Sequence, residues 1–381
     1  MLDFNINFLF QDYNNIKNRN IPSSRFFPYS KLLKIIKEYE NICSILPIGL
    51  SIENRKIFKL KWGNGNYKIF IWSQMHGNET TGTKAMFDLL YFFLKEKNND
   101  LVKFFKKNLT IFFIPILNPD GSEIFQRRNA INIDLNRDAI RLQSPEIKIL
   151  IHEIYVHKPN ILFNLHDQRS IYNIGDKFFN PAILSFLSPY VEKDEKIFFK
   201  SKQSMGLISS IEKNMKFFLP KKGAIGRFSN EIYPTAIGDN LQKKGFPCIL
   251  FEAGNLPNDP HKEIIRKYQA LSLIISFYLL SKNEEYLEKE YLDYFSIPEN
   301  KKKLLDKIFR NVQIQKGKYQ FLVDIGIRNI DHFDFIKKNI HIIYKIVDIG
   351  DLSNFFAYKE IFCNRKNFFP KIGKIKLFDF L

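Results

Sequence analysis

The sequence predicts an α/β fold, and two observations support this prediction. Over the first two thirds of the chain, apolar runs of strand length alternate with amphipathic stretches of helical length. Hydrophobic residues make up 45% of the chain and charged residues 26%, a balance typical of a folded protein and not of a disordered one. The 381 residues exceed one typical domain, so we expect a large α/β core with an appendage.

The strands of this core are predicted from short runs rich in β-branched and aromatic residues. Such runs are too short for independent helices and are typical of strands buried on both faces of a sheet. They cover residues 67–73, 110–116, 160–165 and 247–251.

The helices between these strands are predicted from period and capping residues. Residues 30–42 have a helical period with Ser30 as the expected N-cap, and residues 80–95 form a second helix. A third helix begins at Ser144-Pro145, where proline follows a capping residue. Asp259-Pro260 repeats this signature before a long helix that extends to residue 280.

The pattern changes near residue 283. Residues 284–318 are charged with a helical period, which predicts a helical connector. Residues 319–328 and 341–348 read as strands with no crossover helix between them. We therefore divide the chain into an α/β domain over 1–283, the connector, and a small β-rich subdomain over 319–381.

The composition limits the classes of binding partner and the cellular compartment that we expect for this protein. The formal charge of +18 invites a nucleic-acid interpretation, but the basic residues are scattered without aromatic stacking residues beside them. A lysine-rich surface without a nucleic-acid partner is therefore expected. The three cysteines form no CxxC pair, which favours a reducing compartment. The amino-terminal residues lack the pattern of a leader peptide, and residues 270–280, the longest apolar run, are too short to cross a bilayer. A cytoplasmic protein without a membrane partner is expected.

Metal-ligating residue types follow two of the predicted strands. His76 and Glu79 stand three positions apart after the first strand, and His166 ends the third. Imidazole nitrogens and carboxylate oxygens are zinc ligands, and a catalytic zinc needs three protein ligands. Each part alone has an ordinary structural explanation. The pair His76 and Glu79 fits a solvated helix start, and His166 fits a histidine in the hydrophobic core. Together they predict a metal site at one edge of the sheet.

Other polar groups between and after these positions suit the hydrolysis of a carboxylate-bearing substrate. The chain carries Arg127 and Arg128 and then the pair Asn136 and Arg137, and guanidinium groups bind carboxylates through two parallel hydrogen bonds. Glu252 follows the buried run 247–251, where an unpaired carboxylate is costly unless it has a function. General-base catalysis beside a metal would be such a function.

The motifs HGNE, NPDG, RRNAINIDLNR, NLHD, IYP and FEAG occur in an order that resembles the M14 zinc carboxypeptidases, over residues 56–254. The resemblance implies a three-layer α/β/α fold with a mixed, mostly parallel central sheet. It also implies one zinc ion per chain, held by His76, Glu79 and His166.

The resemblance further implies a role for each remaining site residue. By this similarity Asp134 orients the first zinc histidine, and Arg128 polarises the scissile carbonyl, with Arg127 as the alternative. Asn136 and Arg137 clamp the terminal carboxylate, Tyr233 closes over the substrate, and Glu252 is the general base.

The implied activity is that of a zinc metallocarboxypeptidase, which hydrolyses the last amide bond of a peptide with a free carboxylate. One feature keeps an alternative open. Glu79 and His166 are 87 positions apart, a short spacing that is closer to the related succinylglutamate desuccinylase and aspartoacylase branch. An N-acyl amino acid amidohydrolase with the same zinc site is therefore the second interpretation. NPDG and the tyrosine of IYP favour the peptidase.

Overall fold

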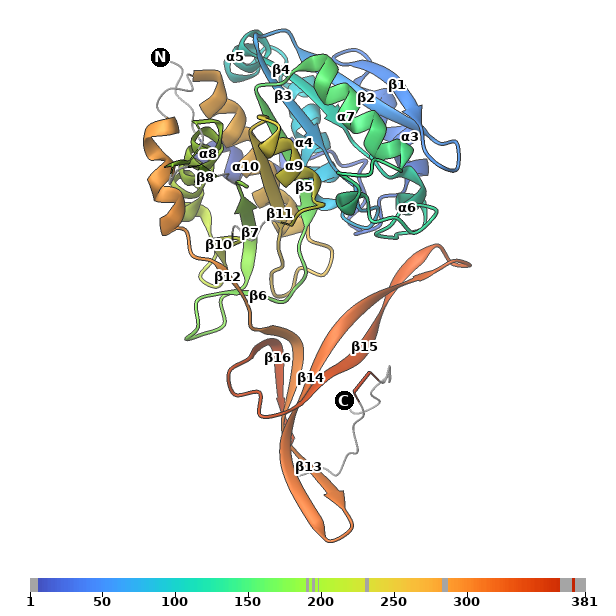
Figure 1. Ribbon diagram of the computed structural model, residues 1–381, viewed down its shortest axis with the longest axis vertical. Coiled ribbons are helices and arrows are strands. Elements are labelled where there is room, and N and C mark those ends of the chain that lie inside the picture. The colour runs from blue at the N-terminus through green and yellow to red at the C-terminus, as the bar shows by residue number, and fades with distance from the viewer. Residues whose placement is uncertain are drawn as a thin grey trace.

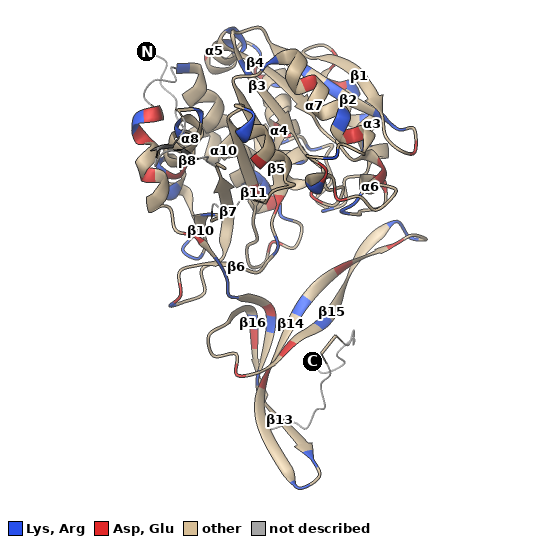
Figure 2. Ribbon diagram, in the orientation of Figure 1, with Lys and Arg blue, Asp and Glu red and all other residues tan. Residues whose placement is uncertain are grey.

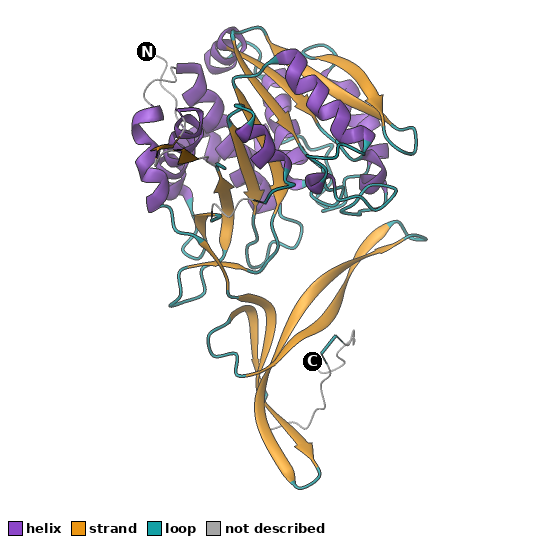
Figure 3. Ribbon diagram, viewed as in Figure 1, coloured by secondary structure: helices purple, strands orange, loops and turns teal. Residues whose placement is uncertain are grey.

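An eight-stranded mixed sheet forms the centre of the larger part of the molecule in this computed structural model (Figures 1 and 3). The structure describes residues 6–189, 192–193, 196–197, 199–229, 233–282, 287–363 and 372–373. The four central strands pair in parallel, whereas β1, β2 and the β7–β11 pair are antiparallel. In spatial order the strands are β1 (Ser44–Leu50), β2 (Lys56–Gly63), β4 (Leu109–Ile114), β3 (Tyr67–Trp72), β5 (Ile161–Asp167), β11 (Cys248–Ala253), β7 (Ala182–Leu187) and β10 (Ala224–Arg227).

Helices cover both faces of this sheet, which gives the predicted three-layer α/β/α fold. In β3, Ile69 and Ile71 belong to one hydrophobic cluster, while Phe70 and Trp72 belong to another. Successive side chains of a strand point to opposite faces, so the two clusters are the cores on either side of the sheet. The first is closed by α4 (Thr81–Lys95), α5 (Asp100–Asn108), α8 (Phe199–Met215) and α10 (Glu263–Lys282), and the second by α7 (Pro145–His157) and α9 (Ile237–Lys243).

Most of the predicted elements of the core are present within a few residues of their expected ends. The predicted runs correspond to β3, β4, β5 and β11, and α7 begins at Pro145 as its capping signature predicts. Asp259 caps the last helix, because its carboxylate accepts hydrogen bonds from the backbone amides of Glu263, Ile264 and Ile265.

The helix expected over residues 30–42 is shorter than predicted. It is α3 (Tyr29–Ile35), followed by the 3-10 turn η1 (Ile36–Tyr39). Pro28 occupies the N-cap position instead of Ser30, and the Ser30 backbone amide donates to the carboxylate of Glu123. This glutamate belongs to the short helix α6 (Pro119–Glu123), so a distant segment supplies the cap.

The C-terminal sheet lies apart from the α/β body in Figure 1, and its hairpin β14–β15 extends back toward that body. In spatial order its strands are β15 (Asn339–Gly350), β14 (Tyr319–Asp334), β13 (Leu304–Lys316) and β16 (Phe356–Phe362). The β-rich subdomain is therefore present, although its residues 364–371 and 374–381 lie outside the described part of the chain.

The helical connector expected over residues 284–318 differs from the structure. Within it the structure has the 3-10 helix η4 (Leu287–Ser296), the short strand β12 (Asn300–Lys302) and β13. In β13 the buried side chains include Leu305, Ile308 and Val312, a spacing that imitates a helix. The pairing of β13 with β14 shifts register between Phe309 and Val312, and such a bulge interrupts the alternation of a regular strand.

Charged groups are spread over both parts of the molecule. Figure 2 shows basic and acidic residues interspersed along the helices and strands of the body and of the C-terminal sheet. Among the helices in the described ranges, none combines the length and the apolar character needed to cross a bilayer.

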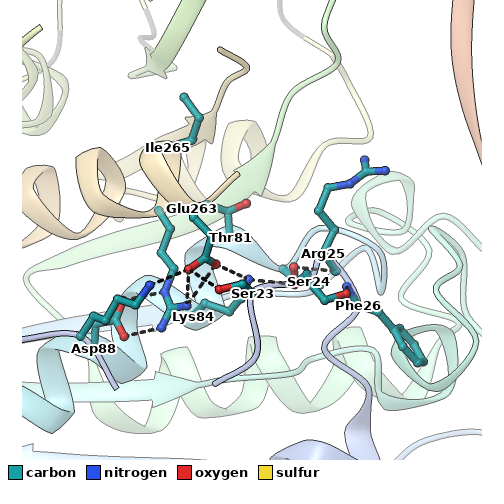
Figure 4. A network of polar contacts seen from close by, with 12 residues as sticks. Ser23, Ser24, Arg25, Phe26, Thr81, Lys84, Asp88, Glu263 and Ile265 are labelled. Carbon is teal, nitrogen blue, oxygen red and sulfur yellow. Dashed lines mark hydrogen bonds and ion pairs between the residues drawn. The ribbon is translucent and has the colours of Figure 1, made fainter. Parts of the chain in front are cut away.

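A buried ionic network fastens the amino-terminal segment to helices α4 and α10 (Figure 4). The guanidinium of Arg266 contacts the carboxylate of Asp88 through Nε at 2.7 Å, and both side chains are fully buried. Glu263 accepts hydrogen bonds from Lys17 at 2.8 Å and Lys84 at 3.1 Å. Because every buried charge here has an opposite partner, removing one would leave another unpaired.

The acid sensitivity of the fold follows from Glu263. Burial alone would raise its pKa, but Lys84 and Arg266 outweigh burial and bring the pKa to about 2. An unfolded glutamate has a pKa of about 4.3, so this stabilisation is present above about pH 4.3 and is lost as the pH falls toward 2.

We expect the wild-type free energy of unfolding to fall across this pH window. Glu263→Gln should reduce that slope, as measured by urea denaturation between about pH 2.5 and 5.5. Asp100→Asn is the matched control, because Asp100 is 84% exposed and lies 3.7 Å from Lys103. An unchanged slope in Glu263→Gln would contradict the prediction.

Candidate metal centre and active site

The candidate site lies where the central parallel strands end. β3 ends at Trp72, four residues before His76, and β5 carries His166 near its end. β5 and β11 pair in parallel with His166 directly opposite Glu252. Since parallel strands bring their carboxyl ends to the same sheet edge, the sheet itself gathers these groups.

The three residues predicted as zinc ligands meet at one point. His76, Glu79 and His166 are buried, and the possible ligand atoms all lie within 4.8 Å of one another. The Nδ1 atoms of the two histidines are 3.1 Å apart, and Glu79 contacts them at 2.9 Å and 2.7 Å. Two nitrogens bound to one tetrahedral zinc would lie roughly 3.3 Å apart, since each Zn–N distance is about 2.0–2.1 Å. The donor set therefore fits a single zinc ion.

The hydrogen bonding of the first histidine also fits a ligand. Nε2 of His76 lies 3.1 Å from the carboxylate of Asp134. A proton held on Nε2 by this carboxylate leaves the Nδ1 lone pair free to bind a metal, which is the usual support of a ligating histidine. Asp134 also caps the 3-10 turn η2 (Leu135–Arg137) by accepting from the amide of Asn136, so its position is fixed by the backbone.

The loop that carries His76 is supported by the NPDG segment. Asn118 caps α6 by accepting from the amide of Gly121, and Pro119 follows at the first helical position. Gly77 lies so close to this turn that a Cβ atom there would stand 2.2 Å from the carbonyl carbon of Gly121. The glycine of HGNE is thus required by a backbone contact, and NPDG acts as a scaffold for the metal loop.

Of the two adjacent arginines, Arg127 contacts the site. Its NH1 lies 3.0 Å from Glu79 and its Nε lies 3.0 Å from Asp134. Arg128 is exposed and donates instead to the backbone carbonyl of Asn132. Arg127, which the sequence analysis gave as the alternative to Arg128, is therefore the arginine beside the candidate zinc ligands.

The expected carboxylate clamp lies beside α9. Asn136 accepts from the amide of Ile237 through its side-chain oxygen, and its NH2 group makes no hydrogen bond with the described residues. Arg137 is exposed, and its guanidinium carbon lies 3.8 Å from the centre of the Tyr233 ring. Ile232, the residue before this tyrosine in IYP, lies outside the described residues. Asn136, Arg137 and Tyr233 are thus neighbours, and Arg137 and Tyr233 are exposed while Asn136 is partly buried.

Glu252 is a buried carboxyl group beside the three candidate ligands. Its Oε2 atom is shielded from solvent and has no hydrogen-bond partner among the described residues. Burial raises the pKa of Glu252 well above its ordinary value, and the negative charges of Glu79 and Asp167 raise it further. For Glu79 itself, burial also raises the pKa, but the two imidazoles outweigh it and hold the pKa well below the usual range.

Sequence reasoning missed two residues behind the site. Asp167 accepts from the Thr81 hydroxyl at 2.6 Å, and its backbone amide donates to Glu79. The buried ammonium of Lys262 lies 3.5 Å from Asp167 and 3.2 Å from the carbonyl of Ala253, the residue after Glu252. Asp167 follows His166 directly, which is a usable signal, whereas no local pattern distinguishes Lys262 from the other lysines of the chain.

Comparison with known proteins agrees with the motifs. A family model described as zinc carboxypeptidase matches residues 29–144. Human carboxypeptidase D is 28% identical over 124 residues, which are 28% of this chain and 9% of that protein. Carboxypeptidase 2 of Trichophyton tonsurans is 33% identical over 104 residues, which are 27% of this chain and 19% of that protein. The chain thus spans less than a fifth of either relative, and the resemblance to the M14 zinc carboxypeptidases is confirmed over residues 29–144.

Solved structures confirm the fold. A metallo-carboxypeptidase from Burkholderia cenocepacia has a TM-score of 0.53 at 16% identity and covers 68% of this chain and 70% of its own. Carboxypeptidase A from Helicoverpa armigera has a TM-score of 0.51 at 15% identity and covers 68% and 75%. The family match ends before His166 and Glu252, so for these two residues the geometry of the sheet is the independent support.

We expect the purified protein to bind one zinc ion per chain and His166→Ala to lose most of it, because one of three protein ligands is removed. Asp134→Asn should weaken zinc binding about 10–100-fold through loss of the support to His76. Elemental analysis and competition with a chelator measure both effects. His152→Ala, which removes an exposed histidine of α7, should keep the full zinc content. Full zinc retention by His166→Ala would disprove the assigned centre.

Proposed function

We propose that this chain is a zinc metallocarboxypeptidase that hydrolyses the C-terminal amide bond of peptides with a free carboxylate. One observation carries the proposal: His76, Glu79 and His166 meet in one buried cluster. Glu252 lies beside this cluster, because it pairs with His166 on the neighbouring strand. The chain matches only a small part of its curated relatives, so the activity rests on this site.

The proton transfers fall to Glu252. When bound, zinc would polarise the scissile carbonyl and lower the pKa of the attacking water. Oε2 of Glu252, which has no hydrogen-bond partner among the described residues, accepts the proton of that water and then delivers it to the leaving amine. The raised pKa of Glu252 supports this role, since a carboxyl group that holds a proton more tightly is a better base.

The remaining groups stabilise charge and orient the substrate. Arg127 stands beside Glu79 and supplies a positive charge for the oxyanion that develops on the scissile carbonyl. The NH2 group of Asn136 and the guanidinium of Arg137 hold the terminal carboxylate, so that only the last amide bond reaches the base. Tyr233 is 52% exposed and stacks on Arg137, a position from which its ring covers a bound substrate.

An N-acyl amino acid amidohydrolase is the second candidate function. The separation of 87 positions between Glu79 and His166 favours it, because this short spacing is closer to that of the succinylglutamate desuccinylase and aspartoacylase branch. The same zinc ligands and the same base would serve both reactions. The cytoplasmic location expected from the sequence stays a prediction.

We expect the zinc-loaded enzyme to hydrolyse peptides with free C-termini, and we expect Glu252→Gln to abolish turnover while zinc remains bound, a loss of at least about 100-fold for a general base. A panel of peptides with free and amidated C-termini and of N-acyl amino acids, followed by mass spectrometry of the products, measures this. Arg137→Ala should chiefly raise the KM for free C-termini.

The panel also separates the two candidate functions. Release of the last amino acid from peptides supports the carboxypeptidase. Turnover of N-acyl amino acids alone supports the second candidate. Zinc-loaded protein that hydrolyses neither class would refute the proposal.

The adjacent arginines provide a matched pair of variants. Arg127→Gln should lower kcat by about 100–1,000-fold, the usual effect of removing one group that stabilises an oxyanion. Arg128→Gln removes the same charge one residue away, where the side chain faces solvent, and should leave kcat nearly unchanged. Steady-state kinetics on one peptide decides between them. The opposite ranking would return the role to Arg128.

A further inference from the structure

One buried side chain closes the loop between Arg127 and Asp134. Asn129 is fully buried, and its side-chain oxygen accepts hydrogen bonds from the amides of Ile131 at 3.3 Å and Ile133 at 2.9 Å. Its own backbone amide donates to the carbonyl of Ile133 at 3.1 Å. Asn129 therefore ties the two ends of this loop together.

A site residue lies next to each end of the closed loop. Arg127 is two positions before Asn129, and Asp134 directly follows Ile133. Nε of Arg127 lies 3.0 Å from the carboxylate of Asp134, and NH1 lies 3.0 Å from Glu79. The contact between Arg127 and Asp134 thus depends on a closed loop.

The same closure separates the two adjacent arginines. Asn132 lies inside the loop with a positive φ of 63°, and its amide donates to the carbonyl of Asn129 at 3.0 Å. The carbonyl of Asn132 accepts from the guanidinium of Arg128 at 3.0 Å. The turn that Asn129 closes therefore binds the side chain of Arg128 to its own backbone, and Arg127 is the arginine that contacts the metal ligand.

The NH2 group of Asn129 is directed at helix α7. It lies 3.4 Å from the carboxylate of Glu146, which is fully buried in the first turn of that helix. Burial raises the pKa of Glu146, and hydrogen bonds, including the one from Asn129, oppose this. The helix start is itself fixed, because Asp138 accepts from the amide and the hydroxyl of Ser144 at 2.7 and 2.6 Å. The first turn of α7 is therefore a firm support for the loop.

We infer that Asn129 is a positioning residue, which holds Arg127 and Asp134 in place from the first turn of α7. Among the described residues, it makes no hydrogen bond to the candidate zinc ligands, so it acts through these two neighbours. The part that concerns Arg127 rests on the proposed function, in which Arg127 stabilises the oxyanion. The part that concerns Asp134 rests on the metal centre alone.

The zinc affinity of the full-length protein tests the Asp134 part without turnover. Asn129→Ala should weaken zinc binding about 10-fold, because the carboxylate that supports His76 loses its fixed position. In the Asp134→Asn background the same substitution should change the affinity less than about twofold, since the group that it positions is already absent. Competition with a chelator measures the four proteins of this cycle.

Steady-state kinetics on the zinc-saturated enzyme tests the Arg127 part. Asn129→Ala should lower kcat about 10–100-fold with little change in KM, because a displaced Arg127 stabilises the oxyanion less well. In the Arg127→Gln background this loss of kcat should disappear.

An exchange of the two buried groups tests the same contact without creating a cavity. Asn129→Asp keeps the oxygen that accepts from Ile131 and Ile133, but it brings a second carboxyl group to Glu146, which is unfavourable. Adding Glu146→Gln returns an amide donor to the pair. The double variant should therefore bind zinc more tightly than Asn129→Asp alone and approach the wild-type affinity.

Asn214→Ala provides the matched control. Asn214 is an exposed asparagine of α8, and its NH2 group donates to the carbonyl of Ser210 at 2.7 Å. This variant should keep both the zinc affinity and kcat.

Three outcomes would overturn the inference. They are an unchanged zinc affinity in Asn129→Ala, an equal weakening with and without the carboxylate of Asp134, and an exchange variant that binds zinc no better than Asn129→Asp. An equal loss of kcat with and without Arg127 would overturn the Arg127 part. The proposed function fails separately, when the zinc-loaded parent enzyme hydrolyses no member of the substrate panel, and the zinc cycle still decides the role of Asn129 then.

Discussion

The constraint on which the site depends is the parallel pairing of β5 with β3 on one side and β11 on the other. The register sets Trp72 opposite Asn164 and Glu252 opposite His166, so the chain leaves all three strands at one edge. Backbone hydrogen bonds fix these positions before any side chain is considered. A slip of one residue in β11 would turn Glu252 to the opposite face, because side chains alternate along a strand. The spacing of the metal ligands and the base is therefore a property of the sheet.

This gathering creates an electrostatic problem that the surrounding residues resolve. Glu79, Asp134, Asp167 and Glu252 bring four carboxyl groups to one sheet edge, and the described positive groups beside them are Arg127 and Lys262. These contacts are distributed unequally. Arg127 forms ion pairs with Glu79 and Asp134, and Lys262 lies next to Asp167. Among the described residues, no cation forms an ion pair with Glu252. Burial and the neighbouring negative charges thus raise the pKa of Glu252. A divalent ion held by His76, Glu79 and His166 would add positive charge at this sheet edge.

The parts that could be predicted from the sequence are those with local causes. Local causes act within a few residues, as in the apolar run of β3, the capping group Asp259 and the proline of α7. The candidate metal ligands could be predicted because each follows or ends a predicted strand. Two backbone features decide which of Arg127 and Arg128 faces the candidate ligands. Phe125 has a positive φ of 51°, which turns the chain, and Gly121 lies close to the backbone of Arg128. Neither feature is visible in the motif. The bulge in β13 gave a strand the spacing of a helix. Lys262 reaches Asp167 and the carbonyl of Ala253 across contacts that only the tertiary fold creates.

The C-terminal sheet and the metal loop are mechanically connected through the amino-terminal segment. Lys84 of α4 donates to the carbonyl of Ser24 at 2.8 Å and also contacts Glu263, so the buried network of Figure 4 holds the residue before Arg25. Arg25 in turn holds Asp331 of the hairpin, and its carbonyl is bound by Thr80 at the start of the same helix. Glu79 immediately precedes this helix start. The end of β14 that carries Asp331 is therefore held, through Arg25, by the start of the helix that follows Glu79. Because the charges of this network are buried and paired, loss of one partner would also loosen the attachment of the hairpin to the α/β body.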